Sequence, residues 1–169
     1  MASTYDISYF FEVTGMSGSG SLLYVCDSGN RRVTRFSMIT GEPYDSYDMP
    51  ANAYPLAVLV GTNRCYVLVN QWDSLLLNPR IDMLIFNLAS PVTDAMTLWK
   101  TVSVSSVGIN SGELPPEYGG LFLQYTGGAL IAGCFNASGN KIVRMNLDGV
   151  ILSTATLSAS DNFYGMVFY

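Results

Sequence analysis

The chain has 169 residues, of which 49% are apolar and only 12% are charged, and it carries a formal net charge of −5. No basic stripe is present to replace the counterions of a nucleic acid, and no run of about 18 apolar residues predicts a membrane span. The chain contains no histidine, which excludes Ser-His-Asp and Cys-His triads and histidine-ligated metal sites.

The first repeat unit, residues 5–49, is predicted to contain four short β-strands. Their residues are mostly β formers, and turns that contain Gly, Pro, Asn or Asp separate them. The clearest turn is Asp27-Ser28-Gly29-Asn30, whose residue types tolerate positive φ or bond their own backbone. The strands are expected at 7–13, 22–26, 32–38 and 44–49, with the Gly/Ser-rich segment 16–21 as a turn.

The same pattern recurs in two further units, residues 50–113 and 114–160. In the second unit, strands are expected at 56–60, 65–69, 81–86 and 98–104, with an insertion at 70–80. In the third unit, strands are expected at 121–125, 129–133, 141–146 and 150–157. Residues 163–169 begin a fourth copy, as a single terminal strand.

The starts of the units define the period. Tyr9, Tyr54, Tyr118 and Tyr164 lie 45, 64 and 46 residues apart by their numbers. Four short strands in every 40–50 residues or so are typical of β-propeller blades. The longer middle spacing is explained by loop insertions in the second unit.

Residues 24–36 read YVCDSGNRRVTRF. This stretch resembles the NHL-type β-propeller repeat, in which Asp, two turn residues, Asn and Arg link two short strands. A weaker match, GNKIVRMN at 139–146, has Ala137 in place of the Asp, and a third, near 65–86, has lost the Asn-Arg core. The resemblance implies a single all-β domain over 1–169, an incomplete β-propeller of about three four-stranded blades plus one extra strand. A β-sandwich is the alternative that the strand pattern leaves open.

Three blades are too few to close a ring, since propellers hold four to eight. The open ends leave apolar faces and an unpaired strand edge, which another chain can cover. We therefore expect a non-enzymatic structural or interaction scaffold that forms a homo-oligomer or polymer, binds other proteins, or belongs to a larger chain. The residues expected at the assembly interface are Tyr9, Phe10, Phe11, Tyr164, Met166 and Phe168.

The resemblance also leaves open a second function, because related lactonase-type propellers bind Ca²⁺ through carboxylate and asparagine oxygens. The chain would then be a ligand- or Ca-binding fragment of such an enzyme. The oxygen donors considered are Asp27, Asn30, Asn70, Asp73, Asn140 and Asp148. No spacing selects a set among them, and such residues in turns commonly bond the backbone, so no catalytic, cofactor or metal residue is predicted.

The three cysteines, Cys26, Cys65 and Cys134, form no Cys-x-x-Cys pair. A zinc site is therefore not expected. All three fall in or beside predicted strands, where a cysteine behaves as a small apolar residue. We expect buried thiols, with one disulfide and one remaining thiol as the alternative.

An extracellular or cell-surface location is expected from the charge-poor composition and from a glycosylation sequon. Ordinary soluble domains have about 25% charged residues, and this chain has only two lysines, Lys100 and Lys141. The sequon begins at Asn136, the candidate N-glycosylation site. Residues 1–14 lack the basic start and apolar region of a signal peptide, so a secreted form would already have lost its signal.

Overall fold

In the computed structural model, the described residues are 12–71, 80–88, 95–104, 121–126, 128–134 and 140–157. Every regular element in these segments is a β-strand, and the twelve strands form three four-stranded antiparallel sheets. Within the described segments, no helix is long and apolar enough to cross a membrane.

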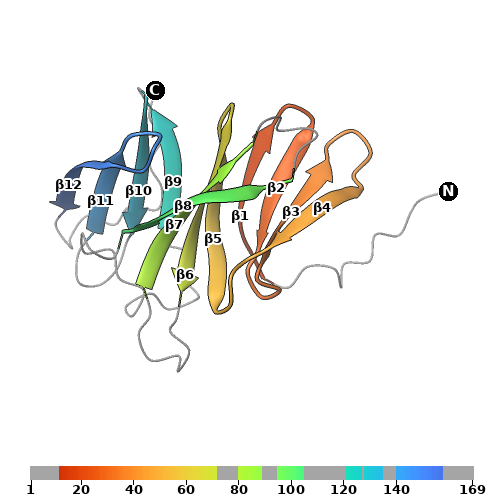
Figure 1. The fold of residues 1–169 in the computed structure, drawn as a ribbon, viewed down its shortest axis with the longest axis horizontal. Coiled ribbons are helices and arrows are strands. Elements are labelled where there is room, and N and C mark those ends of the chain that lie inside the picture. The colour runs from red at the N-terminus through yellow and green to blue at the C-terminus, as the bar shows by residue number, and fades with distance from the viewer. Residues whose placement is uncertain are drawn as a thin grey trace.

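We call the three sheets blades 1, 2 and 3, and Figure 1 shows them side by side in chain order. Blade 1 comprises β1 (Val13–Ser19), β2 (Leu22–Asp27), β3 (Arg32–Ser37) and β4 (Pro43–Asp48). Blade 2 comprises β5 (Ala53–Val60), β6 (Arg64–Gln71), β7 (Arg80–Asn87) and β8 (Thr97–Ser103). Blade 3 comprises β9 (Leu121–Thr126), β10 (Ala129–Cys134), β11 (Asn140–Met145) and β12 (Ile151–Leu157). In each blade, strands that are consecutive in the chain are neighbours in the sheet.

The prediction of a turn at 16–21 is wrong for residues 16–19, which belong to a strand. β1 occupies Val13–Ser19, most of it in the segment expected to be a turn, whereas residues 7–11 lie outside the described part of the chain. Gly15 of β1 serves close packing: a Cβ there would lie 3.0 Å from the Leu56 carbonyl oxygen of β5. Thr14 Oγ1 donates a hydrogen bond of 2.8 Å to the Pro55 carbonyl oxygen. Gly in a strand often marks such an approach of another backbone.

The first core lies between blades 1 and 2. On β2, the residues at alternate positions share one face, and that face packs against blade 2. Tyr47 of β4 reaches the same core, where its ring meets Phe86 edge-on at 4.8 Å between centroids. The fully buried members include Tyr24, Cys26, Val33, Ala53, Cys65, Val67, Val69, Phe86 and Leu88.

Blade 2 is buried on both faces, because a second core lies between it and blade 3. Along β6, Cys65, Val67 and Val69 pack in the first core, whereas Tyr66 and Leu68 pack in the second. A strand covered on both faces has no polar side, which explains the continuous apolar run at 65–69. The second core also includes Ile81, Met83, Ile85, Leu130, Ala132, Val143 and Met145.

The arrangement rules out the β-sandwich alternative, since three sheets of consecutive strands pack in series rather than two face to face. The division into repeat units at 5–49, 50–113 and 114–160 stays a prediction, and the expected terminal strand at 163–169 lies outside the described residues.

Candidate functional site

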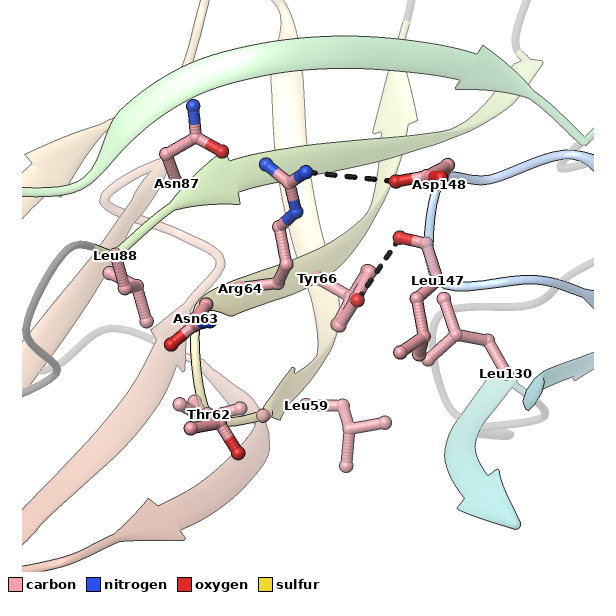
Figure 2. A pocket seen from close by; sticks show the side chains of 12 residues that line it. Leu59, Thr62, Asn63, Arg64, Tyr66, Asn87, Leu88, Leu130, Leu147 and Asp148 are labelled. Atoms are coloured by element: carbon pink, nitrogen blue, oxygen red, sulfur yellow. Dashed lines mark hydrogen bonds and ion pairs between the residues drawn. The ribbon is translucent and has the colours of Figure 1, made fainter. Parts of the chain in front are cut away.

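A cleft of about 880 Å³ lies between blades 2 and 3. Figure 2 shows the turn between β5 and β6 and the end of β7 on one side, and β10 with the β11–β12 turn on the other. Its volume falls in the range of about 300–1,000 Å³ that small-ligand sites occupy. The lining residues are the apolar Leu59, Val60, Leu88, Leu130 and Leu147, with Gly61, Thr62, Asn63, Arg64, Tyr66, Asn87 and Asp148.

Arg64, the first residue of β6, is the cation of the cleft wall. Its guanidinium carbon lies 3.9 Å from the centroid of the Trp99 ring of β8, a close cation–π contact. Nη2 of Arg64 lies 3.6 Å from Oδ1 of Asp148, which is too long for a hydrogen bond. The Asp148 side chain is 61% exposed, so solvent screens this ion pair and its contribution to stability is small.

The β11–β12 turn that carries Asp148 is held by its own residues. Asn146 Oδ1 accepts hydrogen bonds from the Asp148 amide at 3.0 Å and the Val150 amide at 2.8 Å, as asparagine commonly does in turns. Gly149 has a φ of +72°, and a Cβ there would lie 2.6 Å from Val102 Cγ2. Both the backbone conformation and the packing against blade 2 therefore require glycine.

Two hydrogen bonds fasten this turn to blade 2. Tyr66 Oη donates to the Leu147 carbonyl oxygen at 3.1 Å (Figure 2), and Lys100 Nζ donates to the Asp148 carbonyl oxygen at 2.8 Å. Lys100 Nζ also lies 5.8 Å from the Trp99 ring centroid. Among the described residues, Arg64 of blade 2 and Asp148 of blade 3 are thus the charged side chains that line the cleft, and Lys100 bonds the backbone at Asp148 without lining it.

The residues of the NHL-like motif build the β2–β3 turn. The Asp27 carboxylate is fully buried, and it accepts hydrogen bonds from Asn30 Nδ2 at 2.9 and 3.1 Å and from Arg32 Nε at 2.9 Å. Arg31 between them has a φ of +53°, a left-handed conformation that non-glycine residues adopt mainly in turns. These polar side chains therefore stabilise the hairpin.

A buried cation lies in blade 1. Arg35, 1% exposed at its side chain, pairs with Asp45, and its guanidinium carbon lies 5.8 Å from the Tyr24 ring and 5.3 Å from the Tyr44 ring. Burial by itself would lower the pKa of Arg35, but hydrogen bonds to Asp45 and Tyr24 raise that pKa above its ordinary value. Burial raises the pKa of Tyr24. This cluster therefore holds a permanent cation beside a neutral phenol.

The oxygen donors considered for Ca²⁺ are spread over the fold. Asp27 and Asn30 are hydrogen-bonded to each other in blade 1, whereas Asp148 of blade 3 faces Arg64 of blade 2. Asn70 Oδ1 is buried on β6 with no hydrogen-bond partner among the described residues. In that part of the chain, no three His, Cys, Asp or Glu side chains gather where they could hold a metal. The side chains of Asp73 and Asn140 are not among the described ones.

Cys26 and Cys65 are buried free thiols, and burial raises the pKa of both. The side chain of Cys134 lies outside the described residues. The residues expected at the assembly interface also lie outside the described residues, namely Tyr9, Phe10, Phe11, Tyr164, Met166 and Phe168. The same is true of Asn136 of the sequon.

Apolar side chains that the sequence analysis did not select are exposed on blade 1. Met16 is 63% exposed, Met38 52% and Ile39 82%. Met16 of β1 pairs with Val25 of β2. Both side chains lie on the face of blade 1 opposite the β2 residues that pack against blade 2. A Cβ on Gly18 would lie 4.0 Å from Met38 Sδ, so Met38 lies beside β1. We call Met16 and Met38, with the neighbouring Ile39, the outer apolar patch of blade 1.

Comparison with known proteins places the fold. No protein-family model matches the chain, and no curated protein matches it. Among solved structures, it is similar to hydrazine synthase of Kuenenia stuttgartiensis, with a TM-score of 0.61 and 13% identity over 89% of this chain and 39% of that one. The Nup133 β-propeller domain of Vanderwaltozyma polyspora gives a TM-score of 0.58 and 11% identity, over 89% of this chain and 50% of that one. A chain of a nidogen/laminin complex gives a TM-score of 0.52 and 17% identity, over 86% of this chain and 48% of that one.

The chain therefore spans about 39% to 50% of the length of these three structures. At such identities the similarity establishes the fold alone. Together with the three serially packed four-stranded sheets, it confirms the prediction of an all-β, incomplete β-propeller.

Proposed function

We propose that this chain is a non-enzymatic scaffold of NHL-type blades, whose open ends are covered by other copies or by the remainder of a longer chain. The observation that carries the proposal is the series of three blades, in which only blade 2 has a described blade on each side. A closed ring needs at least four blades, so the two end blades have faces for further contacts.

The outer apolar patch of blade 1 supports this reading. Side chains as exposed as Met16 and Ile39 release water when another surface covers them, which favours association. A contact between blade 1 of one copy and blade 3 of the next uses two different surfaces. Such a contact gives a closed ring when the rotation closes, as for two copies with six blades, and a filament when it does not.

The same proposal includes an extracellular or cell-surface location, with a glycan at Asn136. The support is the low fraction of charged residues, 12%, and the sequon. Secretion from eukaryotic cells followed by glycosidase treatment tests it: a shift in mass that Asn136→Gln abolishes is expected, and secretion without such a shift would contradict the glycan.

Light scattering after size-exclusion chromatography tests assembly, with the 18.4 kDa chain as the unit of mass. We expect multiples of this mass, and rings or fibres in negative-stain images. Met16→Glu should shift the population toward monomer, because it places a charge in the contact. Thr101→Glu, which adds the same charge at an exposed position of β8, is the matched control. A monodisperse monomer at micromolar concentration would refute self-assembly for a chain that is complete as given.

A further inference from the structure

We propose that the cleft between blades 2 and 3 binds the carboxyl-terminal residue of a peptide with a large apolar side chain. The Arg64 guanidinium would receive the carboxylate, and the leucines of the cleft would receive the side chain. This site is separate from the assembly proposed above, since the Arg64 cleft lies at the junction inside one chain.

The guanidinium of Arg64 is held in place before any ligand arrives. The contact of 3.9 Å with Trp99 and a side-chain exposure of only 26% limit its freedom, which reduces the entropy lost on binding. Figure 2 shows it between the Asn87 and Asp148 side chains. A guanidinium has five N–H donors, and its contact with Asp148 at 3.6 Å leaves donors for a carboxylate in a two-pronged hydrogen-bonded pair.

Charge complementarity favours an anion here although the chain is acidic overall. Arg64 and Lys100 share one acidic residue, Asp148, and Lys100 bonds its carbonyl oxygen rather than its carboxylate. The other described ion pairs match one arginine to one carboxylate: Arg32–Asp27, Arg35–Asp45 and Arg80–Asp82. Among the described residues, Arg64 and Asp148 are the charged side chains that line the cleft, and Lys100, which does not line it, adds a second cation next to Asp148.

The remaining walls suit a peptide better than a simple anion. Leu59 and Leu147, the latter 40% exposed, offer an apolar surface next to the cation, whereas Leu130 is fully buried in the second core. The side-chain amides of Asn63 and Asn87 lie on the same wall as Arg64, and an amide can both donate to and accept from a peptide group. Carboxylate, peptide amide and apolar side chain occur together at a peptide carboxyl terminus.

The test uses the full chain with Trp72→Phe, so that Trp99 is the single tryptophan, and follows its fluorescence at low salt. Three probes separate the contributions: acetyl-Ala-Ala-Leu with a free carboxylate, the same peptide as its carboxamide, and 4-methylpentanoate, which has the carboxylate and side chain without the amides. We expect the free-acid peptide to bind, and each of the other two to bind at least tenfold more weakly. Equal affinity for the carboxamide would overturn the role of Arg64, and equal affinity for 4-methylpentanoate would overturn the peptide assignment.

Variants locate the contact. Arg64→Met should weaken binding of the free-acid peptide at least tenfold, and Arg64→Lys, which retains the charge without the fork, should also weaken it. Arg144→Met removes the same charge from an exposed position of β11 that does not line the cleft, so it should leave affinity unchanged. Asp148→Asn removes the competing anion, and we expect about threefold tighter binding from the lost repulsion across the cleft. Unchanged binding by both Arg64 variants, or no binding of the free-acid peptide at millimolar concentration, would refute the proposal.

Discussion

Replacing Gly149 by alanine tests the packing that forms the cleft. The glycine lies in the β11–β12 turn with a φ of +72°, and an added Cβ would lie 2.6 Å from Val102 Cγ2 and 2.8 Å from Ile85 Cδ1. The left-handed conformation costs a residue with a side chain about 1–2 kcal/mol, and overpacking in a filled core costs about 1–3 kcal/mol more. We therefore expect Gly149→Ala to lower the free energy of unfolding by about 2–5 kcal/mol, a large share of the 5–15 kcal/mol or so that is typical of domains.

The control is Gly20→Ala. Gly20 also has a positive φ, of +60°, but no atom lies within 4 Å of its added Cβ, so only the backbone cost applies. Urea unfolding followed by circular dichroism measures both variants, and the difference between them isolates the steric contribution. In thermal unfolding, Gly149→Ala should lower Tm by about 4–20 °C, at about 2–4 °C per kcal/mol for a chain of this size. Equal destabilisation by the two variants would refute the close packing of this turn against blade 2.

Three further changes test other parts of the fold. Asp27→Ala removes a fully buried carboxylate and leaves its donors unpaired. It should lower unfolding free energy in urea by about 1–3 kcal/mol, and a neutral result would contradict its structural role. Tyr66→Phe deletes the hydrogen bond to the Leu147 carbonyl and should cost about 0.5–1.5 kcal/mol. A larger loss would mean that the change disturbs the core as well. Because burial raises the pKa of Cys26 and Cys65 above the ordinary 9.0, the folded chain keeps protons that the unfolded chain loses above that pH. Stability should therefore be insensitive to these thiols below pH 9 and fall as pH rises further, less steeply in Cys26→Ala.

The hairpin at blade 1 illustrates what local sequence predicts well. β2 and β3 begin and end within one residue of the expected positions, because β formers flank a turn whose Asp27 and Asn30 bond each other. The interaction is local, so it leaves a local pattern. The same reasoning holds for β6 and β7, whose apolar runs indicate burial on both faces.

β1 was missed because its sequence is shaped by a neighbour that is distant in the chain. Gly18 lies in the segment expected to be a turn but belongs to β1, and the neighbouring Gly15 is small because β5 approaches its backbone. Glycine occurs both in turns and in strands that another backbone approaches closely. Only the three-dimensional position of Leu56 distinguishes these two cases at Gly15.

The cleft was not predicted for a related reason. Arg64, Trp99 and Asp148 come from three segments that are separated by 35 and 49 positions in their numbering, and the stacking of blades brings them together. A weak signal was present in the pairing of Trp99 with the adjacent Lys100 on a strand, but nothing local indicated that Arg64 would lie against the ring.

The burial of blade 2 on both faces has a consequence for how the protein is made. A ribosome adds about 5–20 residues per second, so roughly 3–11 s pass between the synthesis of Asp48 and of Ser103. During that interval the side of blade 1 that carries Leu22 and Tyr24 has no partner sheet. The nascent chain is therefore exposed to aggregation in the middle of translation; slower synthesis would lengthen that interval, whereas a holding chaperone would protect the chain during it.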